Sequence, residues 1–233
     1  MTMNTRKDTM GTALVALTLV AMMVSLYMVF LYAPREATMG DVQRIFYFHV
    51  PSAWVAFFAF FLVFVFSLVY LARSNKRWDT LAAACAEIGV LFCTLVLITG
   101  PIWAKPVWGV WWTWDARLTL TLVLWLIYVA YLMLRHYMTD PERRATFAAV
   151  LGVIGFIDVP LVYFSIRWWR TQHPQPVMAG GGDSGLEAPM LATLLVCIAT
   201  FTLLFFTLLR HRLKLQSLRD EVDALQDRLE QAG

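Results

Sequence analysis

The sequence predicts an all-α integral membrane protein, a bundle of six transmembrane helices followed by a cytoplasmic C-terminal helix. Two features of composition support this class: 60% of the 233 residues are hydrophobic and only 15% are charged, whereas soluble domains are about 45 to 50% apolar. The third is the arrangement of the apolar residues, which fall into six blocks close to the roughly 20 residues that span a bilayer.

The six blocks follow one another along the chain and cover residues 11–33, 49–72, 80–102, 118–134, 146–166 and 189–209. The first block follows Arg6 and Lys7, as the core of a signal peptide would. It is longer than the roughly 7 to 15 residues of such a core, and no convincing A-x-A site closes it. We therefore expect a retained helix. Gly100 and Pro101 are expected to end or kink the third helix.

The tail, residues 213–233, is predicted to be distinct from the membrane domain, residues 1–212. Its apolar residues repeat at spacings of 3, 4, 3 and 4, a coiled-coil pattern; they are Leu215, Leu218, Val222, Leu225 and Leu229. Two heptads alone are marginal as a helix, so we expect the tail to continue from the sixth span or to pair with a partner.

Basic residues predict the orientation of the bundle. The two terminal segments and the two connections on the same side hold 13 Lys and Arg, and the three connections on the other side hold 6. Cytoplasmic loops carry the excess of Lys and Arg. Both termini are therefore predicted to be cytoplasmic, and three loops are predicted to face outward.

The second outward loop concentrates tryptophan: Trp108, Trp111, Trp112 and Trp114 stand directly before Asp115. If this stretch is helical, Trp108, Trp111, Trp112 and Asp115 share one face. An aromatic belt at the membrane surface is the alternative, but only Trp78 is clearly at the opposite surface. We favour a ligand-binding platform. Asp115 is also placed to cap the fourth helix.

Two histidines face outward: His49 at the start of the second span and His173 in the third outward loop. Trp168 and Trp169 of the third loop are predicted to contact the same ligand. His136 and His211 lie on the inner side. A flat, apolar ligand that carries two carboxylates and accepts two axial imidazoles from the protein fits this face, and haem has all of these properties. Arg117 could hold a propionate in a forked pair or contact lipid phosphate.

Other metal and nucleotide sites have little support. Cys85, Cys93 and Cys197 lie inside predicted spans and form no C-x-x-C motif, which favours buried thiols over zinc or disulfide sites. The sequence has no phosphate-loop motif, so an ATP-driven step would need another subunit.

The segment WGVWWTWDARLT resembles the tryptophan-rich WWD signature of the haem-handling protein family, and FYFHVPSAW and WWRTQHP resemble the two histidine segments of its haem exporter C branch. The resemblance covers all six spans. It implies outward haem-binding loops in which His49 and His173 are the axial ligands of haem b carried as cargo, and in which the tryptophans of the second loop and Asp115 contact the haem.

The resemblance also implies a haem-delivery subunit of cytochrome c biogenesis that is not itself an enzyme. The implied partners are the periplasmic haem chaperone CcmE, the ATP-hydrolysing complex of CcmA and CcmB, and the single-span subunit CcmD, besides membrane lipid; no nucleic acid is expected.

Three other functions remain as alternatives. Haem lyases of the same superfamily carry more spans and more outward histidines, and b-type cytochromes usually hold haem between histidines inside their spans. A secondary transporter would be supported by Glu87 and Asp158, two acids within spans, where ionisable groups often mark a transport path. We favour a hydrogen-bonded pair of these two acids that joins helices.

Overall fold

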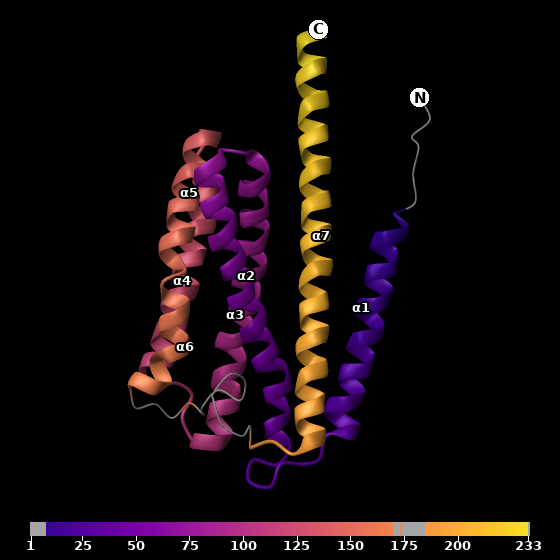
Figure 1. Cartoon of the computed structure of the whole chain (residues 1–233), viewed down its shortest axis with the longest axis vertical. Coiled ribbons are helices and arrows are strands. Elements are labelled where there is room, and N and C mark those ends of the chain that lie inside the picture. Colours follow the sequence, from indigo (N-terminus) through magenta and orange to yellow (C-terminus); the bar gives the residue numbers. More distant parts are fainter. Residues whose placement is uncertain (1–7, 170–172, 174–184, 233) are drawn as a thin grey trace.

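The computed structural model describes residues 8–169, 173 and 185–232, and within these residues six segments are long and apolar enough to cross a membrane. Figure 1 shows them as a bundle of upright helices. The prediction of an all-α membrane protein with six spans is confirmed. The elements are α1 (Thr9–Tyr27), the π-helix η1 (Met28–Tyr32), the 3-10 helix η2 (Asp41–Ile45), α2 (Phe46–Arg73), α3 (Lys76–Trp108), α4 (Ala116–Tyr137), α5 (Pro141–Gly155), α6 (Asp158–Trp168) and α7 (Ala188–Ala232).

Both ends of the described chain lie at the same end of the bundle as the α2–α3 and α4–α5 connections (Figure 1). We call this the termini end and the opposite one the loop end. An even number of spans requires this arrangement.

The third span is longer than predicted. Gly100 and Pro101 do not end it: α3 continues through Pro101 and Pro106 to Trp108. Prolines are tolerated in membrane helices where neighbouring groups satisfy the freed carbonyls. The helix ends at Gly109, whose φ of 78° is left-handed, a conformation that glycine adopts without strain.

The fifth span, predicted as one helix, consists of two. α5 ends at Gly155 and α6 begins at Asp158. Pro160 explains the break, because its ring lacks an N–H and clashes with the carbonyl four residues before it. Asp158 lies in the first turn of α6, where a carboxylate interacts favourably with the helix dipole.

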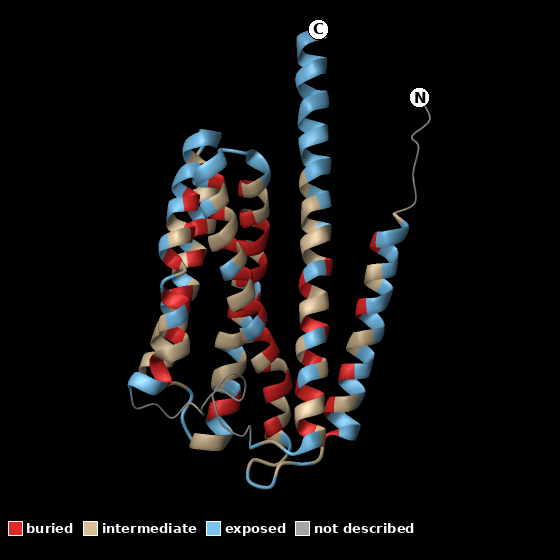
Figure 2. Cartoon of the chain, viewed as in Figure 1, coloured by how far each residue is buried: buried red, intermediate tan, exposed pale blue. Residues whose placement is uncertain are grey.

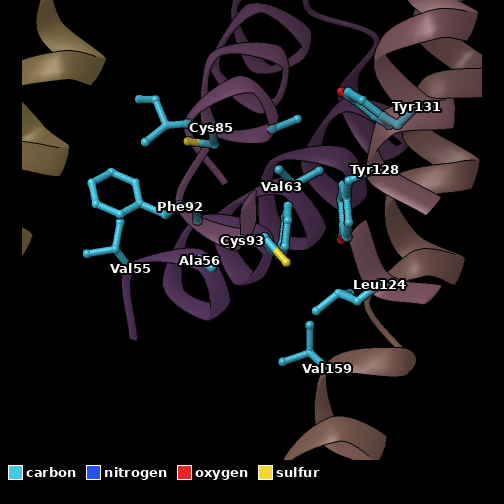
Figure 3. Packing of buried hydrophobic residues seen from close by; sticks show 14 of the residues in the cluster. Val55, Ala56, Val63, Cys85, Phe92, Cys93, Leu124, Tyr128, Tyr131 and Val159 are labelled. Atoms are coloured by element: carbon cyan, nitrogen blue, oxygen red, sulfur yellow. The ribbon is translucent and has the colours of Figure 1, made fainter. Parts of the chain in front are cut away.

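The core forms where α2 packs along α3. Small residues allow the close approach that membrane helices use: a Cβ on Gly89 would lie 2.5 Å from the Phe60 ring. Phe60 in turn stacks on Tyr128 of α4 with ring centroids 3.8 Å apart. Figure 3 shows Tyr128 and Tyr131 on one side of this cluster and Cys85 and Cys93 within it. The three cysteines are buried, as expected for small apolar side chains.

Helices α1 and α7 pack against each other at one side of the bundle (Figure 1). Two hydroxyl pairs join them: Thr18 with Thr207 at 2.7 Å and Ser25 with Thr200 at 2.8 Å. Hydrogen bonds of this kind hold membrane helices together where no hydrophobic driving force acts between them.

The tail continues from the sixth span, as expected, because α7 is one helix up to Ala232. Its heptad residues are exposed, Leu229 by 74%, and Figure 2 shows the C-terminal half of α7 exposed almost throughout.

The predicted pairing of Glu87 with Asp158 is wrong. Glu87 accepts hydrogen bonds from Arg212 of α7, with Nη2 to Oε1 at 2.8 Å. Asp158 is buried, and its Oδ2 has no hydrogen-bond partner. The sequence-based interpretation missed this arrangement because Arg212 lies 125 residues from Glu87.

Candidate ligand-binding cavity

A cavity opens at the loop end between α2, α3, α4, α6 and the 109–115 segment, with an empty volume of about 920 Å³ including its mouth. Most of its wall is apolar or aromatic. The residues that line it are His49, Ala53, Ala56, Phe57, Cys93, Val96, Leu97, Gly100, Pro101, Trp103, Ala104, Trp108, Val110, Trp111, Trp112, Thr113, Asp115, Arg117, Leu118, Thr121, Val162 and His173.

The two outward histidines meet in this cavity. His49 is buried in the first turn of α2, and the ring centroid of His173 lies 6.5 Å from that of His49. A metal bound to imidazole lies about 2 Å from the nitrogen, so an iron between two opposed imidazoles separates their ring centres by roughly 6 Å. The observed spacing therefore fits a shared metal. The residues on either side of His173, 170–172 and 174–184, lie outside the described residues.

Thr99 of α3 sets the orientation of His49, which the sequence did not indicate. The Thr99 hydroxyl lies 2.8 Å from His49 Nδ1 and donates its own hydrogen to the Leu95 carbonyl at 2.7 Å. Its oxygen must therefore accept from Nδ1–H, which leaves the lone pair on Nε2. Metal-binding histidines are commonly held in this way by a second hydrogen bond.

Trp103 is the second residue that sequence reasoning did not single out. It contacts the edge of the His49 ring with centroids 6.0 Å apart. The indole Nε1 atoms of Trp103 and Trp112 are buried without a hydrogen-bond partner, although both residues line the cavity. Buried indole N–H groups usually have a partner, so a ligand with acceptor oxygens would satisfy them.

The tryptophan stretch is not a helix. Trp108 ends α3, and residues 110–115 form an irregular segment. The condition for a shared helical face is thus not met, yet Trp108, Trp111 and Trp112 line the cavity through this folded-back segment.

Trp114, Trp168 and Trp169 lie outside the cavity lining. Trp114 is 76% exposed and contacts Trp112 edge-on with centroids 5.7 Å apart. Trp168 and Trp169 contact each other and are exposed. Their assignment to ligand binding stays a prediction.

Asp115 is the N-cap of α4, as predicted: its Oδ1 accepts from the backbone N–H groups of Arg117 and Leu118 at 3.0 and 3.2 Å. Its Oδ2 accepts from the Thr113 hydroxyl. The carboxylate is therefore occupied, and Arg117 forms no ion pair within the described residues. Arg117 donates one hydrogen bond to the Val162 carbonyl at 3.3 Å, and its other donors are available to an anion in the cavity.

The cavity thus combines two imidazoles with ring centroids 6.5 Å apart, an aromatic wall, one guanidinium and two indole donors. These groups fit a flat apolar ligand that carries a metal and carboxylates. The fold and site together define a six-span membrane protein with an aromatic cavity that contains two histidines at one end of its bundle.

Comparison with known proteins places the chain in a family. The family described as "Heme exporter protein C" (CcmC) matches residues 2–228, and the chain belongs to this family. The protein of that name from Bradyrhizobium diazoefficiens is 40% identical over 91% of this chain and 81% of its own length. Its counterpart in Haemophilus influenzae is 35% identical over 85% and 82%, and that in Rhodobacter capsulatus is 31% identical over 92% and 89%.

Proposed function

We propose that this protein binds haem in the loop-end cavity and delivers it to a periplasmic haem chaperone for the maturation of c-type cytochromes. The observation that carries the proposal is the 6.5 Å spacing of the His49 and His173 rings inside an aromatic cavity. The relatives named as haem exporters support it.

In this proposal haem is the cargo, and the chain performs binding and transfer without covalent chemistry. His49 and His173 would bind the iron through neutral imidazole nitrogens. Trp108, Trp111 and Trp112 would cover the porphyrin face, and Arg117 with the Trp103 and Trp112 N–H groups would receive the propionates.

The proposed partners are the chaperone CcmE at the loop end, the ATP-hydrolysing CcmA and CcmB, and the single-span CcmD. One feature favours delivery over covalent haem ligation: among the described residues two histidines line the cavity, whereas haem lyases of the same superfamily carry more outward histidines. The pairing of Glu87 with Arg212 gives it a structural role and weakens the case for a secondary transporter.

We propose an inner-membrane location with both termini in the cytoplasm, on the basis of the 13 to 6 distribution of Lys and Arg. Single cysteines introduced near Gly181 and at Lys76 test it in intact cells. A thiol reagent that does not cross membranes should label the site near Gly181 and should label Lys76→Cys only after permeabilisation. The reverse labelling pattern would refute the orientation.

The transfer step can be tested with Trp114, which is exposed at the mouth but does not line the cavity. We expect Trp114→Ala to retain haem while transfer to the chaperone slows about tenfold, because a lost aromatic contact of about 1 to 3 kcal/mol then affects the docked state only. Stopped-flow absorbance of haem-loaded protein mixed with the chaperone measures this. Trp78→Ala at the opposite end is the control. Unchanged transfer in Trp114→Ala would exclude this role.

Thr99 offers a test of the histidine orientation. Thr99→Val keeps the shape of the side chain but removes the acceptor for His49 Nδ1–H, and loss of such a partner weakens metal binding by about 10- to 100-fold. Haem titration followed by absorbance measures the affinity. Thr80→Val, which removes an exposed hydroxyl bonded to the Lys76 carbonyl, should leave it unchanged. Equal affinities for the two variants would show that Thr99 does not position the ligand.

A further inference from the structure

A second cavity opens at the termini end, between α3, α4, α5 and α7, with an empty volume of about 1100 Å³ including its mouth. In contrast to the loop-end cavity, it has no aromatic wall of tryptophans, and most of its lining side chains are polar or charged. They are Lys76, Asp79, Thr80, Ala83, Ala84, Glu87, Leu132, Arg135, His136, Arg144, Arg212, Leu213, Gln216 and Arg219.

The lining carries five Lys or Arg side chains and only two acids. Both acids are already paired: Asp79 with Arg135, where Nη2 lies 2.8 Å from Oδ2, and Glu87 with Arg212 at 2.8 Å. Lys76 has a partner outside the lining, the Asp220 carboxylate at 3.4 Å. The positive charges of Arg135, Arg212 and Lys76 are therefore balanced by carboxylates.

Two guanidinium groups remain without an acidic partner. The side chains of Arg144 on α5 and Arg219 on α7 form no ion pair or side-chain hydrogen bond within the described residues, and Arg144 Nε is buried with no partner. Buried donors of a charged group, such as Arg144 Nε, are rarely left unpaired, whereas Arg219 is exposed. The planar guanidinium fork of both residues matches the geometry of a phosphate group. These arginines come from different helices but line the same cavity.

We propose that this cavity binds a phosphate-bearing anion through Arg144 and Arg219. The same chemistry has two sources at a membrane surface. One is the headgroup of an acidic phospholipid, which basic pockets between membrane helices bind on the cytoplasmic side. The other is a free phosphate compound. The site is separate from the haem site and does not depend on it.

The test uses the full chain, delipidated in detergent, with two probes. In the first arm, native mass spectrometry follows the binding of phosphatidylglycerol against phosphatidylcholine. In the second arm, isothermal titration with pyrophosphate in the absence of lipid follows binding of a free anion. Each arginine near a lipid surface contributes about fivefold in affinity, so Arg144→Gln and Arg219→Gln should each weaken binding about fivefold and their combination by more than tenfold.

The matched control is Arg143→Gln with Arg228→Gln, which removes two exposed arginines that do not line the cavity. Thermal unfolding of each variant shows whether the bundle keeps its stability. If the protein retains phosphatidylglycerol selectively and the Arg144→Gln, Arg219→Gln double variant does not, the cavity is a lipid site. If pyrophosphate binds and the same double variant loses this binding, the cavity is a free-anion site. The proposal would be overturned if both lipids bound equally and pyrophosphate did not bind. It would also be overturned if the cavity double variant and the control double variant lost binding equally.

Discussion

Replacing either cavity histidine with alanine is expected to convert a six-coordinate, low-spin haem spectrum into a weaker or high-spin one. His49 and His173 come from distant parts of the chain, and only the folded bundle brings their rings to 6.5 Å. Removing one leaves the iron with a single protein ligand. We expect each variant to bind haem at least about tenfold more weakly and the double variant to retain almost none. Absorption spectra of proteins purified in parallel measure the effect.

The remaining histidines provide the controls. His136 lines the termini-end cavity, and His211 bonds the Thr207 carbonyl, so His136→Ala and His211→Ala should keep the native spectrum. Added imidazole should restore the low-spin spectrum of the single cavity variants by filling the space left by the ring. An unchanged low-spin spectrum in His49→Ala or His173→Ala would show that this histidine does not bind iron.

Replacing Arg135 with glutamine should destabilise the bundle by about 3 kcal/mol or more, because it leaves the Asp79 carboxylate buried without its partner. The two side chains are only 15% and 10% exposed and join α3 to α4 at the termini end. Denaturant unfolding in detergent, followed by circular dichroism, measures the free energy of unfolding.

Two comparisons separate the buried pair from a general charge effect. Asp79→Asn together with Arg135→Gln should recover most of the loss, because neither charge is then left alone. Arg143→Gln, which breaks an exposed pair with Asp140, should change stability by less than about 0.5 kcal/mol. A loss for Arg135→Gln as small as that for Arg143→Gln would contradict the structural role of the pair.

Local patterns in the sequence were enough to predict the six spans and the N-cap of α4. The six apolar blocks depend on composition within about 20 residues, and Asp115 caps the residues that directly follow it. The break between α5 and α6 also has a local cause, Pro160. It was not predicted, because the apolar block around it is long enough for one spanning helix. The helical state of Gly100 and Pro101 is not local, because packing against α2 decides whether α3 continues.

The parts of the site that the sequence did not reveal depend on contacts between distant residues. Their shared outward face, and then the family motifs, indicated His49 and His173 as a pair. Thr99 lies 50 residues from His49, and an isolated threonine in an apolar helix carries no signal of its own. Trp103 resembles a surface aromatic in the sequence but is buried beside His49. Glu87 found its partner on α7, which no spacing rule connects to α3.

The absorption spectrum of the purified wild-type protein after haem loading tests the central claim most directly. With both imidazoles on the iron, the account predicts one haem per chain and a sharp Soret band with low-spin, bis-imidazole features in both the oxidised and the reduced protein. A protein that binds no haem, or that binds it with a high-spin spectrum unaffected by the two histidines, would contradict it.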